Sequence, residues 1–513
     1  MEEEVKETDP TPAQESPDKK VKKHWIHPKW LRIVLKTIMW IIISVVCIAI
    51  IVPFLLYVPP IQTFVKNIAC NVVEKSTGMK IGIDRFRIKW PLDVSLDGVT
   101  VVEATGDTMV YAKEVIADVK LAPLFKLDVD INDLKLEEAG IRIMAPDSSM
   151  LLKLKANLIE IDDKSSVDIK TMTVDVNKLL IQQADLSLDM DVWKKKPAEN
   201  DTAAPINLKI LLHDAEIDGF NFGMAMLPTI DTLSLVSKNV SIRNGVIDLG
   251  KNLITADYLG TSDGDLTYLA PTPEYVKDHP MPVDTTSVAS PPMIIKGDTV
   301  QVIDFKALYA IKDAKPLPGF DPSYLSFSDV NITLDNFYNE ASTVRLPIAS
   351  ISANERSGLM VTSGSGTIAI DSTGLALKEV YLRTPYTYLN ATADIPFAVM
   401  DLQPYAIFNL DAGGSVGWPD IEAFVPDMKP YTSKMPARSP LDFEVIAGGS
   451  LQDIDLDDLN VSIPEVLKVK ASGYAQNAFD LKKLRADVKF EGDVTGPKVI
   501  DKIWNLKDLK FHL

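Results

Sequence analysis

This 513-residue chain has few Cys and aromatic residues, and it has fewer basic than acidic residues. These shortages exclude several classes of protein. Two Cys residues can form neither a disulfide framework nor a four-Cys zinc site. With 53 basic against 71 acidic residues the net charge is −18, which is the wrong sign for a protein that binds phosphate backbones. We therefore expect no nucleic-acid partner. The apolar content of 46% is nevertheless too high for a disordered chain.

Motifs that carry catalysis or bind cofactors are also missing. The sequence has no nucleophile elbow, phosphate-binding loop or zinc-protease helix, and its five His residues lack metal-ligand spacing. His213 and Asp214 are adjacent, but neighbours on a strand point to opposite faces, so both are interpreted as surface residues. The run from Asp453 to Asp458 holds four Asp residues but lacks the Gly and terminal Glu of a calcium loop. We predict that the protein is not an enzyme and has no cofactor or metal site.

One uncharged run, residues 37–58, differs from the rest of the chain. Its 22 residues would form a helix of roughly 33 Å, about the thickness of a bilayer's hydrocarbon core. Seven Lys and Arg residues between Lys19 and Lys36 precede it, so the positive-inside rule predicts a cytoplasmic tail, residues 1–36, and an external remainder. A cleaved signal peptide is the alternative, but its apolar stretch is usually only about 7–15 residues long. We predict an uncleaved transmembrane helix.

Helical periodicity continues just beyond that run. Between Ile61 and Glu74 apolar residues recur at three- and four-residue spacing, and Gly78 provides a stop signal. We expect a helix that caps the start of a β structure. A helix on the membrane surface is the alternative, although its basic content is low.

From Lys80 nearly to the end, apolar and polar residues alternate with the period of two that is typical of strands with one wet face. Phe86, Ile88 and Trp90, separated by basic residues, are an example. At ten to twelve residues each, about 40 strands are expected, which at ~4.7 Å spacing would extend for at most roughly 190 Å. Turns are predicted at the dipeptides Asp97-Gly98, Gly106-Asp107, Asp218-Gly219, Asn244-Gly245, Asp263-Gly264 and Gly448-Gly449.

Amphipathic helices that would cover these strands are few. Short ones are predicted at residues 123–125 and 419–425. The sheet must therefore curl on itself or pack on a second sheet. The predicted organisation is an N-terminal β domain with its leading helix (59–150), β repeats (151–270), a Pro-rich loop or linker (271–293), and further β repeats (294–513) that end in mid-repeat.

Short motifs between Val58 and Ile143 occur in an order that resembles the AsmA-like/TamB family of the double-membrane bacterial envelope. They include Val-Pro-Pro-Ile-Gln at 58–62, Ile-Gly-Ile-Asp at 81–84, Leu-Asp-Val-Ser-Leu-Asp-Gly-Val at 92–99 and Leu-Glu-Glu-Ala-Gly-Ile-Arg-Ile at 136–143. The resemblance implies a single-pass anchor in the inner membrane and a groove-shaped β structure in the periplasm. It also implies that the apolar interior carries phospholipid acyl chains or assists assembly of outer-membrane proteins. Chains of this family are usually much longer and end in a domain that contacts an outer-membrane barrel protein. The sequence leaves open whether this chain has such a partner.

The sequence thus predicts a mainly β protein, with one N-terminal transmembrane helix, an elongated, curled, groove-like repetitive sheet and few short helices. The expected partners are the inner membrane and phospholipid acyl chains. Two alternatives remain: the apolar residues form the dry core of ordinary sandwich domains, or the protein is a passive envelope scaffold. The predicted groove residues are Val119, Leu121, Val129, Val174, Val176, Leu186, Leu188, Ile242, Ile332, Leu334, Ile368, Ile370, Val461 and Val488.

Overall fold

The fold is mainly β in the computed structural model, which describes residues 57–77, 79–89, 93–103, 106–119, 128–145, 148–162, 164–168, 170–191, 207–227, 229–280, 292–400, 403–436, 438–477 and 482–496. The predicted membrane segment, 37–58, lies outside this part of the chain except for its last two residues. Among the described helices, none combines the length and apolar content needed to span a bilayer. The chain divides into two units, residues 1–61 and 62–513, and the sheet belongs to the second.

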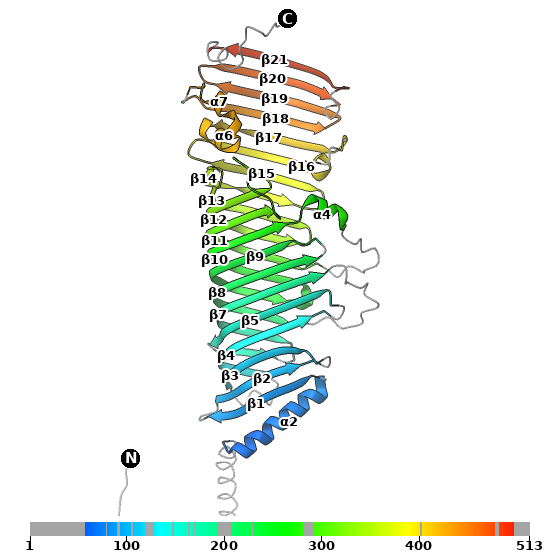
Figure 1. Cartoon of the computed structure of the whole chain (residues 1–513), viewed down its shortest axis with the longest axis vertical. Helices are drawn as coiled ribbons and strands as arrows, with labels where there is room; N and C mark the ends of the chain where they lie inside the picture. Colours follow the sequence, from blue (N-terminus) through cyan, green and yellow to red (C-terminus); the bar gives the residue numbers. More distant parts are fainter. Residues whose placement is uncertain are drawn as a thin grey trace, which may run out of the picture. The chain divides into compact units, whose positions relative to one another are not determined.

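Every described strand belongs to one 21-stranded sheet (Figure 1). The strands are β1 (Lys80–Lys89), β2 (Asp93–Val102), β3 (Thr108–Val119), β4 (Asp128–Met144), β5 (Met150–Asp162), β6 (Ser165–Asp168), β7 (Thr173–Asp191), β8 (Lys209–Leu227), β9 (Thr232–Asp248), β10 (Leu253–Ala270), β11 (Ile294–Ile311), β12 (Tyr324–Glu340), β13 (Thr343–Glu355), β14 (Met360–Ile370), β15 (Gly374–Arg383), β16 (Tyr388–Pro396), β17 (Ile407–Val416), β18 (Leu441–Ser450), β19 (Asp453–Ile463), β20 (Leu467–Gln476) and β21 (Arg485–Val494). Separate sandwich domains are therefore excluded for the described residues.

Strands that follow one another in the chain are neighbours in the sheet, apart from β5 and β6. Their pairing is antiparallel except for β7 with β8 and β10 with β11, which are parallel. Parallel neighbours need a long return connection, and these two pairs are joined by residues 192–208 and 271–293. The Pro-rich segment 271–293 thus connects two adjacent strands of the same sheet. The short strand β6 pairs with β4 and β7, beside the longer β5.

The helices are few, as expected. They are α2 (Pro59–Thr77), η1 (Leu249–Lys251), α4 (Pro273–Asp278), α5 (Phe397–Met400), α6 (Trp418–Phe424), η2 (Pro426–Met428) and α7 (Lys429–Thr432). Helix α2 confirms the predicted helix before the first strand, and α6 confirms the one at 419–425. The one expected at 123–125 lies outside the described residues.

Most of the predicted turns are wrong, because the residues concerned lie inside long strands. Gly219 lies in the middle of the 19-residue β8, and Asp263 lies inside β10. Both have positive φ, at 79° and 54°, so the sequence signal for a left-handed residue is correct. The chain uses that conformation for a kink inside the strand, because the pairing with β9 resumes beyond each residue without a shift of register. Gly106-Asp107 does lie between two strands.

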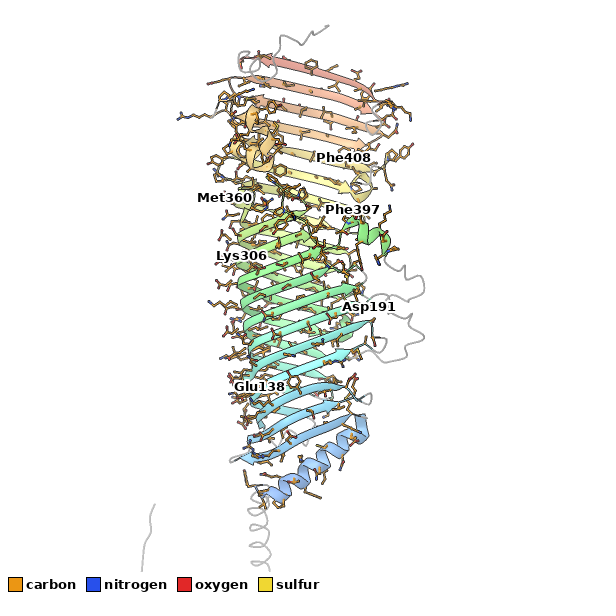
Figure 2. The ribbon with its side chains drawn as sticks, viewed as in Figure 1. Glu138, Asp191, Lys306, Met360, Phe397 and Phe408 are labelled. Carbon is orange, nitrogen blue, oxygen red and sulfur yellow. The ribbon has the colours of Figure 1, made fainter. Side chains whose placement is uncertain are left out.

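These kinks line up across the sheet. In each pair of neighbouring strands from β1 to β11, apart from the short β6, the pairing passes over one facing pair near the middle of the strands and resumes without a shift of register. The residues passed over there are all polar or glycine. In strand order they are Asp84, Gly98, Lys113, Glu138, Asn157, Gln183, Gly219, Lys238, Asp263 and Asp304. The members of this set with positive φ all lie on strands that run in one direction. We call this set the kink column, and Figure 2 labels its member Glu138.

The strands are also longer and fewer than expected. About 40 strands of ten to twelve residues were expected, whereas the described residues form 21, because strands such as β7 and β8 have 19 residues each. At a spacing of ~4.8 Å the ladder of strands extends for roughly 100 Å, half of the upper limit set by the sequence.

Two small clusters form the compact core. In one, Phe305 of β11 packs with Val330 and Ala353 of the next two strands. A Cβ atom at Gly264 would lie 2.3 Å from Cζ of Phe305, so the ring occupies the space that a side chain on β10 would fill. In the other cluster, Trp418 of α6 packs on Ile463 and Val466 at the ends of β19 and β20.

Candidate functional site: the apolar face of the sheet

The strand register places apolar residues on one face of the whole sheet. One row of facing residues shows this, because it can be followed from β1 to β21 with a single residue on every strand except β6. None of its members is charged. In order they are Phe86, Leu96, Val115, Leu136, Ile159, Ile181, Ile217, Val240, Thr261, Val302, Ile332, Ile351, Gly364, Leu382, Leu389, Gly414, Phe443, Val461, Val469 and Gly492.

The kink column keeps this face apolar along each strand. In β7 the apolar residues fall at Leu179 and Ile181 before the kink and at Ala184 and Leu186 after it. A strict alternation would put the second pair on the opposite face. The left-handed conformation of Gln183 interrupts the alternation, so all four side chains lie on one face, although the first two have odd numbers and the last two have even numbers.

Most of the predicted groove residues lie on this apolar face. The described ones share it by register: Val174, Val176, Leu186, Leu188, Ile242, Ile332, Leu334, Ile368, Ile370, Val461 and Val488. Val129 faces Val167, which in turn faces Val174, and Val119 faces Ile131. Leu121 lies outside the described residues.

Side chains on the apolar face are half-buried in most positions. The covered ones include small residues, such as Ala184 at 2% and Ala215 at 1% exposure, and the larger Phe305 at 4%. Large side chains remain accessible, with Ile141 40%, Leu266 37% and Ile370 37% exposed. In a closed sandwich such residues would be almost fully buried. The described face is therefore an accessible apolar surface.

The opposite face carries the charges. Arg243 of β9 bonds to Asp214 and Glu216 of β8, each at 2.6 Å, and these carboxylates raise the pKa of Arg243, chiefly through the hydrogen bond to Glu216. His213 lies 2.9 Å from Asp175 on the same side. His213 and Asp214 were expected to point to opposite faces. Both instead bond to polar-face residues, because the register skips His213 and two neighbours share one side. We call this the polar face.

One polar group lies at the border of the apolar face. Tyr268 stacks on Tyr309 of the next strand, with ring centroids 5.9 Å apart, and donates a hydrogen bond of 2.9 Å to Asp231. Burial and this bond to a carboxylate raise the pKa of Tyr268 to about 12. The phenol is therefore neutral at physiological pH.

A rim of connections packs against strand ends and turns between β11 and β20. Thr387 accepts a bond from the backbone N–H of Gly417, and Thr384 donates to Asp420, which joins the β15–β16 turn to α6. Trp418 Nε1 donates to the carbonyl of Pro436, 3.1 Å away. This rim, residues 417–440 with the turns that they contact, was missed from sequence apart from the short helix, since these contacts join distant segments.

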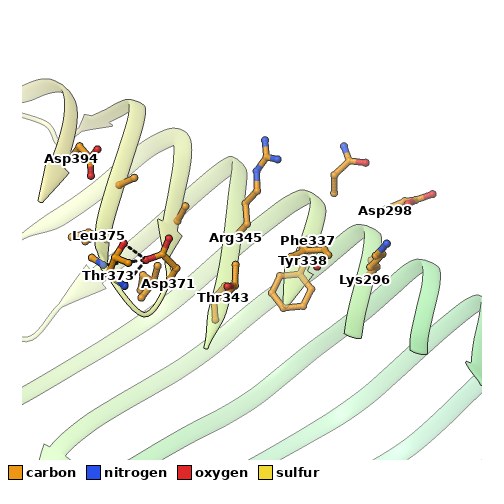
Figure 3. A pocket seen from close by; sticks show the side chains of 17 residues that line it. Lys296, Asp298, Phe337, Tyr338, Thr343, Arg345, Asp371, Thr373, Leu375 and Asp394 are labelled. Carbon is orange, nitrogen blue, oxygen red and sulfur yellow. Dashed lines mark hydrogen bonds between the residues drawn. The ribbon is translucent and has the colours of Figure 1, made fainter. Parts of the chain in front are cut away.

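Cavities between the strands' side chains were also missed. One of about 510 Å³ crosses β11 to β16 (Figure 3). Lys296, Tyr338 and Arg345 form one cross-strand row along it, and the Lys296 ammonium lies 5.6 Å from the centre of the Tyr338 ring. At its other end Asp371 accepts bonds from Thr373 and from the backbone of Gly374, which lower the pKa of Asp371. Charged residues of both signs line this cavity, together with apolar ones such as Ile370 and Leu375.

Among the described residues, no group of three or more His, Cys, Asp or Glu is arranged to hold a metal ion. The run from Asp453 to Asp458 lies in β19, where Asp453 and Asp455 are exposed. The accessible apolar face is thus the feature that best fits a binding function. No protein-family model and no curated protein matches this chain. The assignment of a binding site to the apolar face therefore depends on its geometry alone.

Proposed function

We propose that this protein is a single-pass inner-membrane protein whose periplasmic sheet carries phospholipid acyl chains along its apolar face. The observation that supports this most strongly is the uncharged row of residues that continues through 20 strands of one sheet. Acyl chains need a continuous apolar surface and no specific hydrogen bonds, because each methylene removed from water contributes roughly 0.8 kcal/mol. The accessible apolar face offers such a surface at every strand.

The length of the apolar face and its apolar character also suit a ligand that moves along it. A half-buried surface without polar partners binds by area and has no preferred register, so a chain can shift from one strand to the next without breaking directional bonds. The ladder of roughly 100 Å is several times longer than one acyl chain. A lipid would therefore occupy successive positions along it, with its headgroup in solvent.

The membrane anchor and the compartment of the sheet are inferred from the sequence. The uncharged residues 37–58 and the basic residues before them support a location of the sheet outside the cytoplasm, and the resemblance to AsmA-like proteins supports the periplasm. Residues 59–513 carry a net charge of −19. Much of that charge lies on the polar face, where mutual repulsion discourages aggregation of a large sheet.

Two other functions use the same architecture. An assembly factor for outer-membrane proteins would offer the apolar face to unfolded strands or would contact an outer-membrane barrel, and a passive scaffold would need no accessible face. The exposure of Ile141, Leu266 and Ile370 favours a binding role over the scaffold.

Photocrosslinking in living cells tests the proposal. A photoreactive benzophenone residue replaces Leu188 or Ile370 on the apolar face, and the matched controls are Ser187 and Ala369, their chain neighbours on the polar face. Val174 is a third apolar-face position. We expect phospholipid adducts at the three apolar-face positions and none at the controls.

The outcomes separate the alternatives. Adducts to nascent outer-membrane proteins without lipid would support the assembly factor. An absence of both adducts at Val174, Leu188 and Ile370, in cells where the protein is folded and membrane-bound, would rule out lipid carriage and support the scaffold. Equal labelling of Ser187 and Leu188 would show non-specific membrane contact and would also contradict the proposal.

A further inference from the structure

Helix α2 is fixed to the first strand by polar side chains. Gln62 donates a hydrogen bond of 3.4 Å to the carbonyl of Ile88, and Lys66 donates one of 3.0 Å to the carbonyl of Ile83. Gln62 and Lys66 are four residues apart and so lie on one side of the helix. Gln62 is only 7% exposed. The side of α2 that faces β1 is therefore hydrophilic at these two positions.

The opposite side of α2 presents two large apolar side chains to the outside. Phe64 is 64% and Ile68 is 47% exposed. At roughly 100° per residue, each lies about 200° around the helix from Gln62 or Lys66. Asn67 and Asn71, which are also exposed on this side, are uncharged. Two large apolar side chains of α2 thus lie away from the strand that the helix contacts.

The position of α2 in the chain indicates what covers this side. The helix begins at Pro59, directly after the uncharged run 37–58. Phe64 follows Val58 by six residues, so along a helix it lies within roughly 9 Å of the end of that run. The polar layer on each side of a bilayer is about 5–8 Å thick. Chain connectivity alone thus keeps Phe64 within reach of the membrane surface.

We propose that the exposed side of α2, with Phe64 and Ile68 at its centre, rests in the headgroup layer of the bilayer that holds the anchor. This inference depends on the proposed anchor and is independent of lipid carriage. Two apolar side chains offer much less area than the ~800 Å² per partner of a stable protein interface. They suffice for a helix that is already tethered to its membrane, because tethering makes the contact intramolecular. Such docking would orient β1 and the start of the apolar face at the bilayer.

Spin labelling of the full-length chain in vesicles tests this docking. The vesicles contain phosphatidylethanolamine and phosphatidylglycerol, and the native Cys47 and Cys70 are replaced by Ser. A nitroxide label is attached to Phe64→Cys or Ile68→Cys, with Arg85→Cys on β1 as control because that side chain is 68% exposed. We expect both helix labels to be accessible to oxygen and protected from a water-soluble nickel reagent, at a depth of roughly 5–10 Å. The Arg85→Cys label should show the reverse.

Two results would overturn the inference. Helix labels that the nickel reagent reaches as readily as the Arg85→Cys label would place α2 in water. Labels that are protected from both reagents, and that remain so in lipid-free detergent, would show a protein contact such as a second copy of the chain. Failure of lipid carriage is separate, because it would remove the crosslinks at Leu188 and leave the labels on α2 at the same depth.

Discussion

The ring of Phe424 stacks on the ring of Phe320, with centroids 4.5 Å apart and planes 15° apart. The backbone N–H of Phe320 also donates to the carbonyl of Phe424 at 3.2 Å. The pair joins the β11–β12 connection to the segment between β17 and β18, although five strands separate β11 from β17. The rim is therefore held together by contacts between segments that are distant in the chain.

Replacement of Phe424 by Ala should loosen the rim without unfolding the sheet. Phe424 is 47% exposed, so we expect a loss of about 1 kcal/mol, close to the value of an aromatic pair. Hydrogen exchange of amides in residues 417–436 should then accelerate about five-fold, while exchange in β7 and β8 stays unchanged. Tyr405→Ala is the control, because that side chain is 78% exposed. Acceleration across the whole sheet would contradict a local role.

Two glycines four residues apart in β8 should respond differently to Ala. Gly219 has φ of 79°, and a Cβ there would lie 2.6 Å from the Gln183 amide nitrogen. We expect Gly219→Ala to lower the free energy of unfolding by about 1–2 kcal/mol. A Cβ at Gly223 has nothing within 4 Å and no positive φ, so Gly223→Ala should be neutral or slightly stabilising. Urea unfolding followed by circular dichroism measures both. Equal losses would show that the kink column does not require the left-handed conformation.

Stability on the apolar face should depend on how deeply each side chain is covered. Phe305 is 4% exposed and Leu266 is 37% exposed on the same face. We expect Phe305→Ala to lower the free energy of unfolding by about 3–4 kcal/mol and Leu266→Ala by about 1 kcal/mol. Comparable losses in urea unfolding would mean that Leu266 is covered in solution, which would weaken the case for an accessible face.

Alkaline pH should destabilise the protein through Tyr268. Burial and the bond to Asp231 raise the pKa of Tyr268 to about 12, whereas an unfolded Tyr ionises near pH 10. Between these values the folded state binds more protons than the unfolded state, so its stability falls as pH rises. Tyr268→Phe should remove this contribution. The difference in unfolding free energy between the two proteins should be constant below pH 10 and should change above it. A constant difference up to pH 12 would contradict the raised pKa.

The strand content and the apolar face could be predicted from the sequence because both depend on local alternation. Val174 with Val176 and Leu186 with Leu188 follow the period of two, and they do lie on one face. The kinks could not be distinguished from turns, because Gly219 and Asp263 carry the same conformational signal in either role. Which of the two forms depends on whether the neighbouring strand has a matching kink, which is a long-range property.

The rim and the side of α2 that faces the protein could not be predicted from the sequence, for a related reason. Phe320 and Phe424 are about a hundred residues apart, and neither belongs to a periodic pattern. In α2 the helical period was evident, but the period alone does not tell which side meets the protein. That depends on the carbonyls of β1, which accept bonds from Gln62 and Lys66 and so turn Phe64 outwards.

The sequential pairing of the strands has a consequence for how the protein unfolds. Each strand is stabilised mainly by its two neighbours, so the sheet behaves as a nearly one-dimensional chain of coupled units. Such systems lose units from their ends or at weak interfaces while the rest stays folded. A single melting temperature would then describe this protein poorly. Its midsection, where Phe305 and its neighbours are covered, would retain structure at temperatures at which the flanking strands have already separated.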